Sequence, residues 1–151
     1  MSMLFDSVIA DEVFQKRLFF GEFEAGLSTT MSIGGELVLV LRRAMSVAWC
    51  LEARLRGIEL GRNARMYGRP VLKKHPESFF QLVEGVVLNS SVRANPLGNA
   101  MPCVLRTVAH GAHLTMGPGA GVSSSVIVAA QFVAIAEGAQ IGAGSLIMDT
   151  D

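Results

Sequence analysis

Histidine is the residue type in this chain best suited to acid–base or metal chemistry, and the sequence contains three histidines. His110 and His113 lie three residues apart in VAHGAH, whereas His75 lies in the polar stretch KKHPE. A pair at this spacing could bind a metal ion or supply a general base. No third histidine falls in the repeated part of the chain described below, so no metal is expected. We expect His75 at the surface and the other two pointing outward, toward solvent or a neighbouring subunit.

Serine and cysteine are the other potential nucleophiles. The run Ser123–Ser125 has no general base near it at a recognisable spacing, which favours small-residue packing at a corner. Cys50 and Cys103 have no metal-ligand spacing and are predicted to be buried, reduced thiols.

The charges exclude some classes of function. The formal net charge is zero, which argues against a general nucleic-acid-binding protein. Basic residues concentrate between Arg42 and Arg106, and both ends of the chain are acidic. Acidic residues stand where the basic region of a signal peptide would be expected. The sequence therefore predicts a cytoplasmic protein, with or without membrane association.

Residues 36–56 are predicted to form a helix that ends before Gly57. Apolar residues recur at spacings of three and four, at Leu37, Leu41, Ala44, Ala48, Leu51 and Leu55. A second apolar row, which includes Trp49, widens this surface, so the helix must bury two sides. We expect it to pack on the rest of the domain or on a neighbouring subunit. The alternative is a membrane-surface helix whose arginines face anionic lipid.

From Leu60 onward, short units with a period of six residues replace the helical pattern. Aliphatic residues or methionine open successive units at Met116, Val122, Val128, Ile135, Ile141 and Ile147, with one extra residue at Ala134. This period is typical of a parallel β-helix, in which three short strands form one coil and the aliphatic residue points to the axis. The predicted inward-facing set is Leu60, Met66, Val122, Val128, Ile135, Ile141 and Ile147.

Two stretches, LKKHPESFFQ and RANPLGNAMPC, break the period and are expected to be loops. The predicted organisation is an N-terminal segment over residues 1–56 and a β-helix over residues 57–151.

The β-helical region resembles the hexapeptide-repeat acyltransferases, and among them the maltose, galactoside and polysaccharide O-acetyltransferases. The motifs that carry the resemblance are GRPVL (68–72), VVLNSS (86–91), NPLG (95–98), GVSSSVIVAA (121–130) and IGAGSLIMDTD (141–151). The resemblance implies a left-handed β-helix and a homotrimer with active sites between subunits. It also implies transfer of acetyl from acetyl-CoA to a hydroxyl of a sugar or polysaccharide, with one histidine as general base.

The same resemblance implies the candidate catalytic residues. Asn89 matches an asparagine beside the catalytic histidine, and Asp149 and Asp151 precede the position where that histidine is expected. The expected base therefore falls after Asp151, which indicates a truncated, impaired form, and His110 or His113 would be the substitute base.

Coenzyme A phosphates could meet a run of basic side chains, although a solvated face explains the same run: Arg62, Arg65, Arg69, Lys73 and Lys74. A zinc-dependent carbonic anhydrase class shares this fold, but its ligand spacing does not match His110 and His113. The alternative to an acetyltransferase is a non-catalytic trimeric β-helix that serves as a scaffold.

Overall fold

A computed structural model describes residues 33–92 and 101–150, and for residues 33–37 the backbone alone. The chain divides into two compact units, Met1–Gly35 and Glu36–Asp151. The second unit contains the strands and all but the first three residues of the helix. The boundary that the sequence predicts after residue 56 stays a prediction. The expectations for residues 1–32, and for the loop centred on 93–100, lie outside the described residues.

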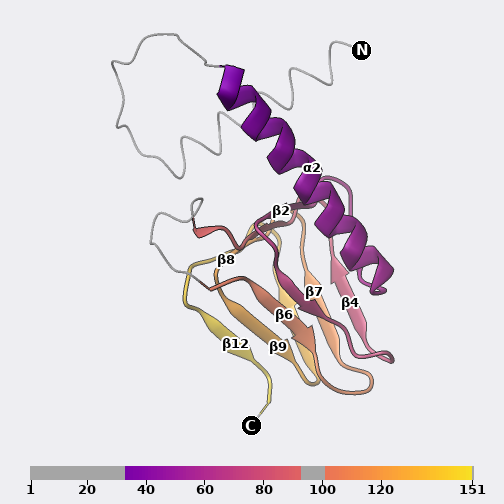
Figure 1. The fold of residues 1–151 in the computed structure, drawn as a ribbon. Coiled ribbons are helices and arrows are strands. Elements are labelled where there is room, and N and C mark those ends of the chain that lie inside the picture. Colours follow the sequence, from indigo (N-terminus) through magenta and orange to yellow (C-terminus); the bar gives the residue numbers. More distant parts are fainter. Residues whose placement is uncertain (1–32, 93–100, 151) are drawn as a thin grey trace. The chain divides into compact units, whose positions relative to one another are not determined.

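The described strands are short and follow one another closely along the chain (Figure 1). They are β1 (Glu59–Leu60), β2 (Arg65–Tyr67), β3 (Val71–Lys73), β4 (Phe79–Leu82), β5 (Val87–Asn89), β6 (Val104–Thr107), β7 (His113–Met116), β8 (Gly121–Ser123), β9 (Val126–Ala129), β10 (Phe132–Ile135), β11 (Gln140–Ile141) and β12 (Leu146–Met148).

Every strand pairs in parallel with the third strand along the chain. Sheet A has the order β1-β4-β7-β10, sheet B the order β11-β8-β5-β2, and sheet C the order β12-β9-β6-β3. Three consecutive strands therefore form one coil with one strand in each sheet, and Figure 1 shows β6, β9 and β12 side by side. The prediction of a mainly β chain preceded by a helix is confirmed, and the sheets form a parallel β-helix-like fold.

The core lies between the three sheets. Side chains alternate between more and less buried positions along strands such as β7 and β9, as the period of two in an extended chain requires. Fully buried side chains from the two middle coils include Phe80, Leu82, Leu88, Leu105, Leu114, Met116 and Ile127. The predicted inward positions in the outer coils are partly buried and pack against this core: Leu60, Ile135, Ile141 and Ile147. Met66 and Val122 are buried, as predicted.

The prediction that Val128 points inward is wrong. Ile127 and Ala129 are buried in β9, and Val128 faces outward between them. The segment from Val122 to Ile127 is one residue shorter than the segment from Ile141 to Ile147 with which it pairs. Because side chains alternate in a strand, a shift of one residue exchanges the buried and exposed sets.

The one-residue difference in length falls in the turn Ser123–Ser125, just before β9. Ser124 has a φ of 42° and is completely buried. The irregular step therefore lies at Ser123–Ser125, whereas the sequence placed it at Ala134.

Helix α2 spans Ile33–Leu55, in agreement with the helix predicted over 36–56. Gly57 ends it with a φ of 76°. The amide of Gly57 donates to the carbonyl of Arg54, and the amide of Ile58 donates to the carbonyl of Ala53. These two hydrogen bonds form a Schellman motif, and the buried Ile58 and Ala53 provide its apolar contact.

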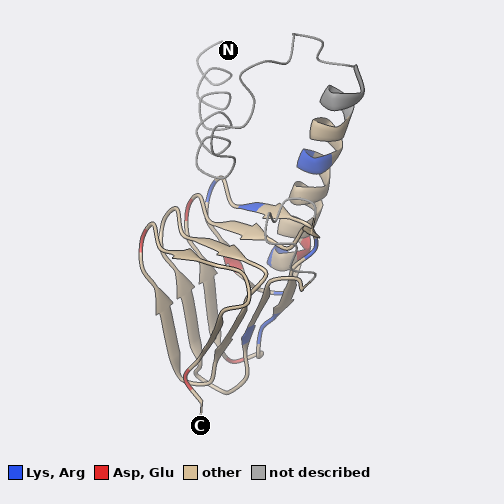
Figure 2. Ribbon diagram, turned by 90° about the vertical axis from the view of Figure 1, so that its left-hand side faces the viewer, with Lys and Arg blue, Asp and Glu red and all other residues tan. Residues whose placement is uncertain are grey.

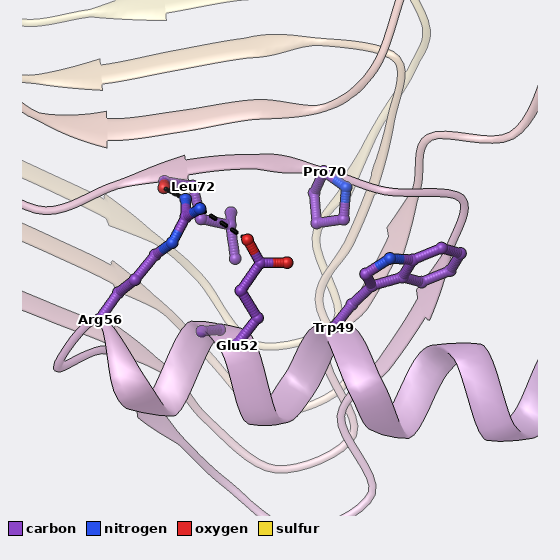
Figure 3. Close-up of a pocket in the computed structure, with 6 residues that line it drawn as sticks. Trp49, Glu52, Arg56, Pro70 and Leu72 are labelled. Atoms are coloured by element: carbon purple, nitrogen blue, oxygen red, sulfur yellow. Dashed lines mark hydrogen bonds and ion pairs between the residues drawn. The ribbon is translucent and has the colours of Figure 1, made fainter.

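One side of α2 packs on the first coil (Figure 3). Ala53 is buried, and Trp49 and Cys50 lie against the core. Arg56 donates to the carbonyl of Leu72 at 2.8 Å and to Glu52 at 2.6 Å. The described basic residues lie on α2 and on the first two coils (Figure 2), and no lysine or arginine follows Arg106 in the sequence.

We expect Gly68→Ala to destabilise the fold more than Gly111→Ala. Both glycines have positive φ, 76° and 68°, so alanine costs about 1–2 kcal/mol at either position. A Cβ on Gly68 would also lie 2.7 Å from the backbone carbon of Ser90, whereas nothing lies within 4 Å of one on Gly111. Urea unfolding of the two variants measures the difference, and equal losses would contradict the close approach at Gly68.

Candidate functional site

All three histidines of the chain lie along one edge of the coils, where the chain passes from sheet C to sheet A. His75 lies in the turn between β3 and β4, His110 in the turn between β6 and β7, and His113 begins β7. The next turns along this edge hold residues 130–131 and Asp149. We call these turns, with the first residues of β4, β7 and β10, the histidine edge.

His110 forms a pair with a carboxylate from the neighbouring coil. Its Nε2 lies 3.5 Å from Oε2 of Glu77, and both side chains are exposed, by 80% and 68%. The amide of Gly111 donates to the carbonyl of Glu77 at 2.8 Å, which holds the two turns together. An exposed pair of this kind adds little to stability, but a carboxylate beside an imidazole can orient the ring.

Three polar residues position the turn that carries Glu77. Ser78 Oγ donates to the carbonyl of His75 at 2.7 Å and lies 2.6 Å from Oγ1 of Thr107. The same Thr107 oxygen accepts from the amide of His75 at 2.9 Å. The sequence did not identify these residues as candidates, because Glu77 and Ser78 had only the polar stretch around His75 as a signal and Thr107 had none.

His113 is held by rings instead of by a carboxylate. It pairs in register with Phe79 of β4 and Phe132 of β10, and its ring centroid lies 5.4 Å from the first and 6.2 Å from the second. This column lies on the outer face of sheet A, and Phe132 is 64% exposed. The sequence prediction that both His110 and His113 point outward is confirmed.

Asp149 closes the histidine edge at the last described coil. Its carboxylate accepts hydrogen bonds from the backbone amides of Ala130, Gln131 and Phe132 at 2.6, 2.7 and 2.5 Å. The hydrogen bond from the Ala130 amide is the largest influence that lowers the pKa of this carboxyl group. The geometry gives Asp149 a structural contact in the turn before β10, and Asp151 lies outside the described residues.

Asp149 should make the free energy of unfolding decrease as the solution becomes acidic. Its folded-state pKa lies below the ordinary value of 3.8, so its contribution is fully present above that value. The contribution is lost as the pH falls from there through the lower folded pKa. We expect Asp149→Asn to have a lower melting temperature at neutral pH and a weaker loss of stability in acid. Parallel acid dependences of the variant and the parent would contradict this role.

Asn89 lies at a different edge, where the chain passes from sheet B to sheet C. It is nearly buried, and its Oδ1 accepts from the amide of Ser91 at 3.2 Å. Its backbone carbonyl accepts from the amide of Ser124 at 3.0 Å and from Cys103 Sγ at 3.2 Å. The structure thus does not bring Asn89 together with Asp149 within one chain. Ser125 is buried at this edge, where its hydroxyl donates to two backbone carbonyls.

The five basic residues suggested for coenzyme A phosphates are spread over different surfaces. Arg65 begins β2 in sheet B, and Lys73 ends β3 in sheet C beside Arg106. Arg69 binds Glu52 of α2 at 2.8 Å. Within the described residues these side chains therefore do not form a single phosphate site.

Two small hollows lie between α2 and the first coil. One, of about 10 Å³, lies beside Trp49, Glu52 and Arg56 (Figure 3), and the other, of about 50 Å³, lies beside Arg42 and Tyr67. Binding sites for cofactors are several times larger, about 300 Å³ or more. In the described ranges, no three histidine, cysteine, aspartate or glutamate side chains gather to hold a metal ion.

Comparison with known proteins adds no relative. No protein-family model matches the chain, and neither a curated protein nor a solved structure matches it.

Proposed function

We propose that this protein is an O-acetyltransferase of the hexapeptide-repeat class, with left-handed coils, that transfers acetyl from acetyl-CoA to a hydroxyl of a sugar or polysaccharide. The observation that carries the proposal is the pair formed by His110 and Glu77 on an exposed edge of parallel coils. An imidazole held by a carboxylate and open to solvent can accept a proton from an incoming hydroxyl.

In the proposed reaction, His110 Nδ1 takes the hydroxyl proton as the acceptor oxygen attacks the thioester carbonyl carbon, because Nε2 faces Glu77. A carbon–oxygen bond forms, and collapse of the tetrahedral intermediate breaks the carbon–sulfur bond. The protonated imidazole returns its proton to the departing thiolate, so the products are an acetyl ester and free coenzyme A. Glu77 stabilises the imidazolium while it carries the proton.

The proposed active assembly is a homotrimer that joins through sheet C. The outer face of this sheet carries an apolar row in register: Val71, Val104, Val126 and Leu146. Leu146 is 63% exposed in the single chain, so association would remove apolar surface from water. The two edges of sheet C carry Asn89 and the histidines. Contact through this sheet would place these edges beside a neighbour, with a groove for acetyl-CoA between subunits.

The test combines a thioester-cleavage assay with light scattering. Purified protein is mixed with acetyl-CoA and a panel of sugar and polysaccharide acceptors, and thiol release is followed with and without acceptor. Acceptor-dependent release by a trimer supports the proposal. A trimer without turnover, alone or extended by any residues encoded after Asp151, would favour the scaffold function, for which the apolar face of sheet C provides the contact. A monomer without turnover would contradict both functions.

A further inference from the structure

The outer side of helix α2 carries a continuous apolar stripe. Val40, Val47, Leu51 and Leu55 recur at spacings of four and seven, which places them on one side of the helix. They are exposed by 62%, 67%, 56% and 80%. Four large aliphatic side chains in a row, this open to solvent, form a surface that is costly to leave in water.

The opposite side of α2 is already occupied by the first coil. Ser46 Oγ accepts from the amide of Met66 at 2.9 Å, and Ala53 is buried beside Trp49. The helix therefore has two apolar sides, as its sequence predicted, and the structure shows what covers one of them. The stripe on the other side has no cover from the described coils.

The charged residues of α2 differ between its exposed side and its docked side. Arg43 and Arg54 lie on the helix surface next to Val47 and Leu51 by helical position, and arginines appear in blue on α2 in Figure 2. Among the α2 side chains that the structure describes, Glu52 is the acidic one. Glu52 lies on the docked side and binds Arg56 and Arg69. The charged α2 side chains next to the stripe are therefore arginines.

We propose that the stripe of α2 binds the surface of a membrane rich in anionic lipid. The helix lies in the plane of the interface, with its aliphatic side chains about 5–10 Å into the headgroup and acyl boundary and its arginines at lipid phosphates. In the described part of the chain, no helix is long and apolar enough to cross a membrane. The mode is therefore surface attachment, which leaves the coils and the histidine edge in water. This inference does not depend on acetyl transfer.

The experiment is sedimentation of the protein with vesicles of phosphatidylcholine, with and without phosphatidylglycerol, at low and high salt. We expect binding to the anionic vesicles that weakens with salt. The double variant Val47→Glu with Leu51→Glu should lose it at least tenfold, since it removes apolar contact and adds repulsion. A second variant, Arg43→Gln with Arg54→Gln, keeps the stripe and should bind roughly thirtyfold more weakly, since each arginine contributes about fivefold near an anionic surface.

The matched control is Phe132→Glu with Ala134→Glu, which makes the same charge change at two exposed positions of β10. It should bind vesicles as the parent does. Trp49 is the sole tryptophan and lies on the docked side, so its emission reports whether α2 remains on the coil in each variant.

Three outcomes would overturn the proposal: a parent protein that stays in the supernatant with anionic vesicles, unchanged binding of the Val47 and Leu51 double variant, or equal losses in the β10 control. A fall in molar mass on changing Val47 and Leu51, without vesicle binding by the parent, would instead identify the stripe as a contact between copies of this chain.

Discussion

Leu105→Asp is expected to leave the coils unfolded. Leu105 is completely buried in β6 and pairs in register with Leu72 and Ile127, which are also buried. Truncation of a buried leucine alone costs about 2–5 kcal/mol, and an unpaired carboxylate in this position adds a further desolvation cost. The sum is comparable to the total stability of a typical domain, about 5–15 kcal/mol. Far-ultraviolet circular dichroism should therefore show loss of the β signal.

The matched control is Leu146→Asp, which makes the same chemical change on the outer face of the same sheet. Leu146 is 63% exposed, so the aspartate remains in water and the β signal should be retained. The proposed trimer should nevertheless weaken, because the change introduces a charge into the apolar row of sheet C. A folded Leu105→Asp protein with parental stability would contradict the assignment of β6 to the core.

His110→Ala should lower kcat for acetyl transfer by about 10²–10⁴, the range expected when a positioned general base is lost. The KM for acetyl-CoA should change little, because the imidazole acts on the acceptor hydroxyl and not on coenzyme A binding. Glu77→Gln should cause a smaller fall in kcat at the same KM, since Glu77 acts through the histidine and is 3.5 Å from it. Glu77→Asp should restore part of that loss.

His75→Ala and His113→Ala are the controls on the same edge. His113 packs between Phe79 and Phe132, so its loss should affect packing more than kcat. If His113→Ala abolishes turnover and His110→Ala does not, the base is His113. If none of the three histidine changes matters in an active protein, the base lies outside the described residues.

Much of the fold was predictable from short-range pattern. The period of six residues predicted most of the strands and most of the inward side chains, and the spacing of apolar residues predicted α2 with its stop at Gly57. The prediction of a loop for LKKHPESFFQ is wrong in part, since its two ends belong to β3 and β4 and only its middle forms a turn. These features depend on local geometry, since alternation in a strand and 3.6 residues per helical turn act within a few residues. The prediction for Val128 was wrong because the segment from Val122 to Ile127 is one residue short, and this shows only when neighbouring coils are paired.

The sequence by itself determined which residue types could do chemistry, and it correctly placed His110 and His113 outward. Only the tertiary structure decided their neighbours. Glu77 and His110 are far apart in the chain and meet because strands three apart stack in register, which superimposes the turns of successive coils. The same stacking separates Asn89 from Asp149 by the width of sheet C. Packing on the first coil covers one side of α2, while the other side stays exposed. Such proximities arise from long-range pairing, which a local period does not encode.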